Sequence, residues 1–186
     1  MYVSMIIWVL SGIRQFPTKY RYFFISIAIS DPLNKMLIGL EIYTGNYVFL
    51  ITSLLGFYST LKFDPYGKDK ILYFVLPVIM IITFFITGTT ELAFVLIHLF
   101  IFYKVFKIAT LDLFENKHFS IFKYLLVFYE ITVILNVTLR YLEATQFYFL
   151  FFVMFAFQVF IGLFYVIFRE DKSKLTIDIK MLQEGH

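Results

Sequence analysis

Apolar side chains occupy this sequence in long continuous runs instead of alternating with polar ones. Each run holds only a few polar residues and is followed by a short polar or basic segment. An α-helix needs about 20 apolar residues to cross the hydrocarbon core of a bilayer. The pattern therefore predicts seven transmembrane helices, near residues 1–13, 22–41, 43–61, 71–87, 91–110, 122–141 and 146–168.

The first run is shorter than the other six. Its residues 1–13 cover about 20 Å as a helix, against a hydrocarbon core of about 30 Å. They form either a short tilted span or a helix at the membrane surface, which gives seven spans or six. A signal peptide is not indicated, because no small-residue cleavage site follows and the basic residues Arg14, Lys19 and Arg21 come after the apolar stretch.

The composition also indicates a lipid environment. Of the 186 residues, 61% are hydrophobic and 16% charged, whereas soluble domains have about half and about a quarter. With 26 Phe and only 8 Gly, the helices are expected to contact one another mostly through bulky side chains. The predicted fold class is an all-α integral membrane protein, with one compact helical bundle over 1–168, short loops and a short tail over 169–186.

The basic residues predict how the chain is oriented. We assign 14 of the 16 Lys and Arg residues to alternate loops or the tail, counting Lys104, Lys107 and Lys123, which lie toward the ends of their spans, with the loop between those spans. The exceptions are Lys35, near the centre of a span, and Arg140, on the opposite side. Basic residues are retained on the cytoplasmic side. We therefore expect a cytoplasmic C-terminus in a plasma (inner) membrane, with the N-terminus outside if there are seven spans. Because these residues flank apolar runs and form no continuous stripe, no nucleic-acid partner is indicated.

Two local patterns predict details of the chain path. Gly88 is expected to end one helix, with the hydroxyl of Thr89 or Thr90 capping the next and Glu91 in its first turn. In the tail, the alternating sequence from Leu175 to Met181 indicates an extended piece or a frayed continuation of the last helix, able to dock on a partner subunit.

Several classes of chemistry lack their residues. No Cys is present, which excludes disulfides, thiolate nucleophiles and iron–sulfur clusters. Only His98 of the three His lies well inside a span, which argues against catalytic zinc and paired-histidine haem. The last apolar run has no Lys for a retinal Schiff base, and neither a Gly-x-Ser-x-Gly elbow nor a phosphate-binding glycine loop occurs. We assign no catalytic residue, metal or cofactor from the sequence.

Ionisable residues at the membrane centre are the candidates for function. Each costs about 2.5 to 3.5 kcal/mol to insert and therefore needs a partner, a cavity or a role. The primary candidates for a ligand site, an ion site or a proton relay are Asp31, Asn34, Lys35, His98 and Glu130.

Each candidate also has a purely structural interpretation. Asp31 and Lys35 lie one turn apart beside Pro32, so they can neutralise each other. Glu130 has no basic neighbour within one turn of its own helix, so it must be protonated, paired with Lys35 or His98, or next to water. A lone membrane histidine such as His98 is more often a hydrogen-bonded packing residue than a ligand.

Four further polar residues are secondary candidates. Ser53 and Gln158 lie near the centres of their spans and suit helix-to-helix hydrogen bonds. Asn136 and Arg140 are four residues apart near the predicted outer surface, where the arginine can extend toward water.

Three functions fit these observations. The first is a membrane protein that binds a small ligand or ion in a central polar cavity, as a transporter component or a receptor without its own effector domain. The second is a non-catalytic structural or regulatory subunit of a larger membrane complex, which the tail at 169–186 helps to assemble. The third is a membrane enzyme acting on a lipid, with Asp31 or Glu130 as acid or base.

Overall fold

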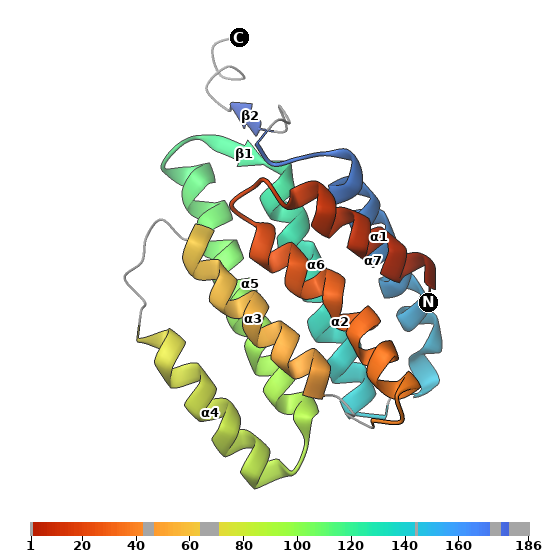
Figure 1. The fold of residues 1–186 in the computed structure, drawn as a ribbon. Coiled ribbons are helices and arrows are strands. Elements are labelled where there is room, and N and C mark those ends of the chain that lie inside the picture. Colours follow the sequence, from red (N-terminus) through yellow and green to blue (C-terminus); the bar gives the residue numbers. More distant parts are fainter. Residues whose placement is uncertain (1, 43–46, 64–70, 144, 172–175, 179–186) are drawn as a thin grey trace.

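The apolar runs form helices in the computed structural model, which describes residues 2–42, 47–63, 71–143, 145–171 and 176–178 (Figure 1). The prediction of an all-helical chain is confirmed, with one short 3-10 helix and two three-residue strands in addition. In chain order the elements are α1 (Tyr2–Gln15), α2 (Arg21–Gly39), α3 (Tyr47–Phe63), α4 (Leu72–Thr87), α5 (Thr90–Phe114), β1 (His118–Ser120), α6 (Ile121–Tyr141), η1 (Thr145–Phe147), α7 (Tyr148–Ile167) and β2 (Thr176–Asp178).

Three of these helices, α5, α6 and α7, are long and apolar enough to cross a membrane. Helices α3 and α4 are apolar but shorter, and α1, with 14 residues, measures about 21 Å. Large apolar side chains cover the outside, among them Phe74 and Phe85 on α4, each 80% exposed, and Phe152 on α7 at 76%. Contiguous exposed apolar surface of this kind suits contact with lipid. Seven spans, the cytoplasmic C-terminus and the plasma membrane remain predictions.

Helices α5 and α6 lie side by side in the middle of the bundle (Figure 1). Helix α3 packs against both α2 and α5, and α1 lies between α2 and α7. Helix α4 is at the edge and packs on α5. The completely buried Ile97 of α5 and Leu126 of α6 belong to the core between these helices. Helices α2, α3, α5 and α6 therefore pack one against the next.

Bulky side chains make most of the core between the helices, as expected, but helix α1 approaches its neighbours through glycines. A Cβ atom placed on Gly12 would lie 2.8 Å from the Ala28 Cβ of α2, and one on Gly162 would lie 2.6 Å from the Ile7 Cγ2 of α1. The space over Gly162 also admits the Ser11 hydroxyl, which donates to the Gly162 carbonyl at 2.9 Å. A few well-placed glycines therefore suffice for close packing in a chain rich in phenylalanine.

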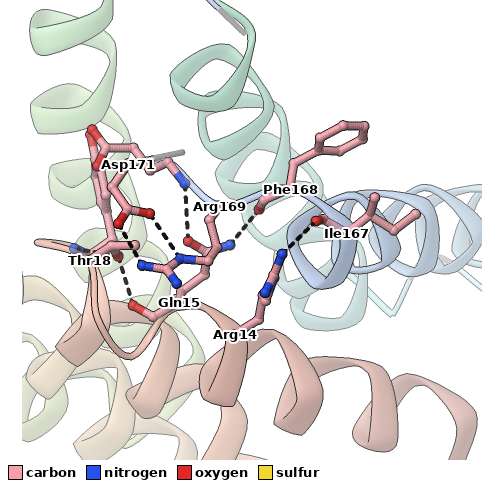
Figure 2. A network of polar contacts seen from close by, with 9 residues as sticks. Arg14, Gln15, Thr18, Ile167, Phe168, Arg169 and Asp171 are labelled. Carbon is pink, nitrogen blue, oxygen red and sulfur yellow. Dashed lines mark hydrogen bonds and ion pairs between the residues drawn. The ribbon is translucent and has the colours of Figure 1, made fainter. Parts of the chain in front are cut away.

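A buried glutamine joins the end of α1 to the end of α7 (Figure 2). The Gln15 Nε2 donates to the carbonyl oxygens of Tyr165 and Phe168 at 2.8 and 2.6 Å, and its Oε1 accepts from the Glu170 backbone N–H at 3.5 Å. Arg14 adds a longer bond to the Ile167 carbonyl at 3.4 Å. Since the last carbonyls of a helix have no partner within it, Gln15 acts as a cap supplied by another helix.

Replacing Gln15 by methionine is expected to lower the free energy of unfolding by about 1 to 3 kcal/mol, because the size is kept while one buried and one partly buried carbonyl lose their donor. Thermal unfolding of the purified chain in detergent measures this change. Gln158→Met is the matched control, since the Gln158 amide donates one longer bond, of 3.3 Å, to Thr132. Equal destabilisation in the two variants would contradict the capping role.

The connection between α4 and α5 agrees only in part with the sequence-based prediction. Gly88 has a φ of +67° and its N–H bonds to the Phe84 carbonyl at 2.8 Å, so it ends α4 as expected. Glu91 lies in the first turn of α5, also as expected. Thr89 occupies the cap position but makes no side-chain cap bond; its hydroxyl lies 3.2 Å from that of Thr87. The Thr89 hydroxyl therefore contacts Thr87 at the end of α4 and does not cap α5.

The opposite end of the bundle holds the tail and several of the basic residues. Strand β2 pairs antiparallel with β1, with Phe119 opposite Ile177, so this part of the tail is extended; residues 172–175 and 179–186 lie outside the described residues. Lys19 pairs with Glu170 at 3.0 Å. Lys104, counted with the loop between the fifth and sixth spans, lies within α5 and is buried, since α5 continues past residue 110 to Phe114.

Candidate functional site

A cavity of about 570 Å³ lies between α2, α3, α5 and α6. Ser4 and Trp8 of α1 and Gln158 of α7 complete its wall. The lining residues Arg140 and Glu143 are exposed, so the cavity reaches the surface where α6 ends. In Figure 1 this end of the bundle lies opposite β1 and β2.

Three polar side chains from three helices form a chain of hydrogen bonds in the wall of this cavity. The His98 Nδ1 of α5 lies 2.6 Å from the Glu130 Oε2 of α6, and the His98 Nε2 lies 3.0 Å from the Ser53 Oγ of α3. When Glu130 is ionised, the N–H at Nδ1 donates to the carboxylate, and Nε2 accepts from the serine hydroxyl. Helix packing thus sets the orientation of the imidazole from both sides.

Burial differs along this chain. The Glu130 side chain has no exposed surface and that of His98 is 8% exposed, while Ser53 is partly buried. The Phe94 ring, one helical turn before His98, lies 4.4 Å from the imidazole centre. The Glu130 Oε1 is buried with no hydrogen-bond partner among the described residues. A carboxylate in such a place needs a cation or a donor from outside the chain, or a proton.

Carboxylates outnumber cations in the cavity lining. The lining includes one imidazole, that of His98, and one guanidinium, that of Arg140. The carboxylates of the lining are those of Asp31, Glu91, Glu130 and Glu143. The lining thus contains four carboxyl groups against two basic groups. The electrostatic potential inside therefore favours cations.

Aromatic rings form much of the apolar wall. Trp8 and Tyr129 lie with ring centres 4.7 Å apart, and both line the cavity together with Phe23, Phe49 and Phe94. The faces of such rings attract cations, and tryptophan does so most strongly. Carboxylates and aromatic rings together constitute a suitable surface for an organic cation.

Most of the residues singled out from the sequence meet at this cavity. Those lining it are Asp31, Ser53, His98, Glu130, Asn136, Arg140 and Gln158. Of the two partners considered for Glu130, the structure selects His98.

Asn34 and Lys35 are not among the lining residues. Lys35 extends toward α1 instead, with its Nζ 3.6 Å from the Met5 Sδ and 3.9 Å from the centre of the Tyr2 ring. Asp31 and Lys35 share a helical face, but a long flexible side chain reaches a neighbouring helix that a short carboxylate does not.

Sequence reasoning did not place Glu91, Glu143 or the aromatic rings of Trp8 and Tyr129 in a site. The two glutamates lie at helix ends, where a charge needs no special explanation. The rings lie in apolar runs, where nothing distinguishes a cavity wall from a lipid-facing or packed side chain. Comparisons with protein-family models, with curated proteins and with solved structures return no match for this chain.

Proposed function

We propose that this chain is a multi-pass membrane protein that binds a small organic cation in the central cavity, as the binding component of a transporter or receptor. The observation on which the proposal rests most is the excess of carboxylates over cations in the lining, which includes Asp31 and Glu130. A cation can approach these groups while its apolar part contacts Trp8 and Tyr129.

The size of the cavity supports a ligand larger than a metal ion. Small-molecule sites have volumes of about 300 to 1,000 Å³ and are mostly apolar, with a few polar groups fixing orientation. The volume of about 570 Å³ falls within that range. Among the described residues, no group of three or more His, Cys, Asp or Glu side chains is placed to hold a metal ion. An amine with an apolar body fits this lining.

The orientation inferred from the basic residues places the cavity mouth on the outer side of the membrane. Arg14 and Arg169 lie where α1 and α7 end (Figure 2), and Lys19 pairs with the glutamate that follows Arg169. This is the end of the bundle that holds β1 and β2, while Arg140 and Glu143 lie at the mouth. Under the positive-inside rule the first end is cytoplasmic. The ligand then enters from outside the cell.

Binding is expected for primary or quaternary ammonium compounds and not for their neutral or carboxylate counterparts. Thermal shift and calorimetry on the purified chain measure this with a panel matched in size. Asp31→Asn and Glu130→Gln should weaken binding about 10- to 100-fold each, the effect of losing one interaction with a charged group. Both changes keep the side-chain shape, so folding should be retained.

Glu41→Gln is the matched control, because Glu41 is exposed and is not among the lining residues. It should bind ammonium compounds like the unaltered chain. Preferential binding of carboxylates, or unchanged binding in both Asp31→Asn and Glu130→Gln, would contradict the proposal.

A further inference from the structure

We propose that Ser53, His98 and Glu130 form a nucleophile, general base and orienting carboxylate that hydrolyse an ester in the cavity. The identity of the substrate rests on the proposed function: a carboxylic ester that also bears an ammonium group. The catalytic inference itself rests on the geometry of the three side chains.

The atoms that face each other are those that such chemistry requires. A serine nucleophile needs a base on its hydroxyl, and the base needs a group on its other nitrogen that fixes the tautomer and stabilises the imidazolium. The Ser53 Oγ lies 3.0 Å from the His98 Nε2, and the Glu130 Oε2 lies 2.6 Å from the His98 Nδ1. Both distances are within hydrogen-bond reach, and each nitrogen has a different partner.

The surroundings add to this geometry. All three residues line the cavity, so a bound ester can reach the hydroxyl. Glu130 is completely buried and His98 nearly so, and in such a low-dielectric site a carboxylate stabilises a developing imidazolium more strongly than in water. A role in packing alone would not require Ser53 to lie on the cavity wall.

The reaction proceeds in two steps with water as co-reactant. The Ser53 Oγ attacks the ester carbonyl carbon while its proton passes to the His98 Nε2; the bond to the alcohol oxygen breaks, and that oxygen takes the proton from His98. A water molecule then attacks the acyl–serine ester with His98 again as base. The carboxylic acid leaves, and the proton returns to Ser53.

The negative oxygen formed during attack must be stabilised by side chains. Ser53 lies inside α3, where its backbone N–H belongs to the helix. Other serine enzymes use the backbone at a sharp turn, which is the Gly-x-Ser-x-Gly arrangement that this sequence lacks. The lining contains a side-chain amide donor on α7, that of Gln158, which here donates to the Thr132 hydroxyl at 3.3 Å and would have to exchange that bond for one to the oxyanion.

A fluorophosphonate probe tests the nucleophile without knowledge of the substrate. The Ser53 Oγ should attack phosphorus and displace fluoride, while its proton passes to His98. The purified full chain should gain one adduct by intact mass, and peptide mass spectrometry should locate it on Ser53. Ser53→Ala should abolish the label. Ser59→Ala, also on α3 but not among the lining residues, should leave it unchanged.

The two partners are tested by the rate of labelling. His98→Gln should slow it by about 100-fold or more, the usual contribution of a general base. Glu130 acts through His98 as a positioning residue, so its charge must matter more than its shape. Glu130→Asp should retain more labelling than Glu130→Gln. A packing role predicts the opposite order, because glutamine is isosteric with glutamate.

The outcomes separate this inference from the proposed function. A folded, monodisperse chain that acquires no adduct, an adduct on any residue other than Ser53, or faster labelling in Glu130→Gln than in Glu130→Asp would overturn the catalytic inference. Cation binding without labelling would leave the proposed function intact. Labelling of Ser53 without binding of any ammonium compound would support the catalysis and reject the cationic substrate.

Discussion

Replacing His98 by leucine is expected to lower the free energy of unfolding by about 3 to 5 kcal/mol. The Glu130 side chain is completely buried, and the His98 Nδ1 is the hydrogen-bond partner of its Oε2. Its Oε1 has no partner among the described residues. Without the imidazole, neither carboxylate oxygen keeps a partner in the described part of the chain. Unfolding of the purified chain in mixed detergent, followed by circular dichroism, measures the loss.

The double variant His98→Leu with Glu130→Leu should recover most of that stability. Replacing both members of a buried pair by apolar side chains of similar size is often neutral, whereas removing one member is costly. The four chains form a double-mutant cycle whose coupling energy isolates the pair. His118→Leu is the control, because His118 is exposed in β1. If the losses in free energy of unfolding caused by His98→Leu and Glu130→Leu simply add in the double variant, the pairing is contradicted.

Replacing Gly162 by leucine is expected to separate α1 from α7. Even a Cβ at this position would lie 2.6 Å from the Ile7 Cγ2 and 3.4 Å from the indole of Trp8. The Ser11 hydroxyl, which reaches the Gly162 carbonyl, would lose its place. Overpacking costs about 1 to 3 kcal/mol or more, and the Gln15 cap should weaken with it. Proteolysis at the end of α1 and thermal unfolding measure the change.

A compensating change of Ile7 in α1 tests whether the clash at Gly162 of α7 is the cause. Gly162→Ala is a milder form of the same clash, and adding Ile7→Ala removes the methyl group that the new Cβ meets. The double variant should therefore be more stable than the sum of the two single changes predicts. Gly39→Leu is the matched glycine control, since nothing lies within 4 Å of a Cβ placed there. Equal losses at Gly39 and Gly162 would reject the close contact as the cause.

The helices follow from the sequence more fully than the contacts between them. Runs of apolar residues predict helix whatever lies beside them, because in lipid the backbone must satisfy its own hydrogen bonds. Glu130 likewise had to be protonated, next to water, or paired with one of two basic residues, Lys35 or His98. The choice between these two depends on the rotation of α2, α5 and α6 about their axes, and the sequence does not specify that rotation.

Two further results depend on neighbours far apart in the chain. Gly162 is one of 8 glycines, and the positions of Ile7 and Trp8 distinguish it from Gly39. Nothing in the sequence around Ser53 distinguishes it from other serines in helices, because His98, the partner that makes it a candidate nucleophile, is 45 residues away in sequence. Neither case has a local pattern that marks it.

The sequence by itself therefore determined that the chain is helical, that it is apolar enough for a membrane, and that a few central charges need an explanation. These properties depend on hydropathy, backbone hydrogen bonding and the cost of burying charge, which act residue by residue. Tertiary structure alone decided that Ser53, His98 and Glu130 form one chain, that Lys35 extends toward α1, and that carboxylates and aromatic rings surround one cavity. Distances of about 3 Å between helices depend on how the helices pack and rotate, and packing is a property of the whole bundle.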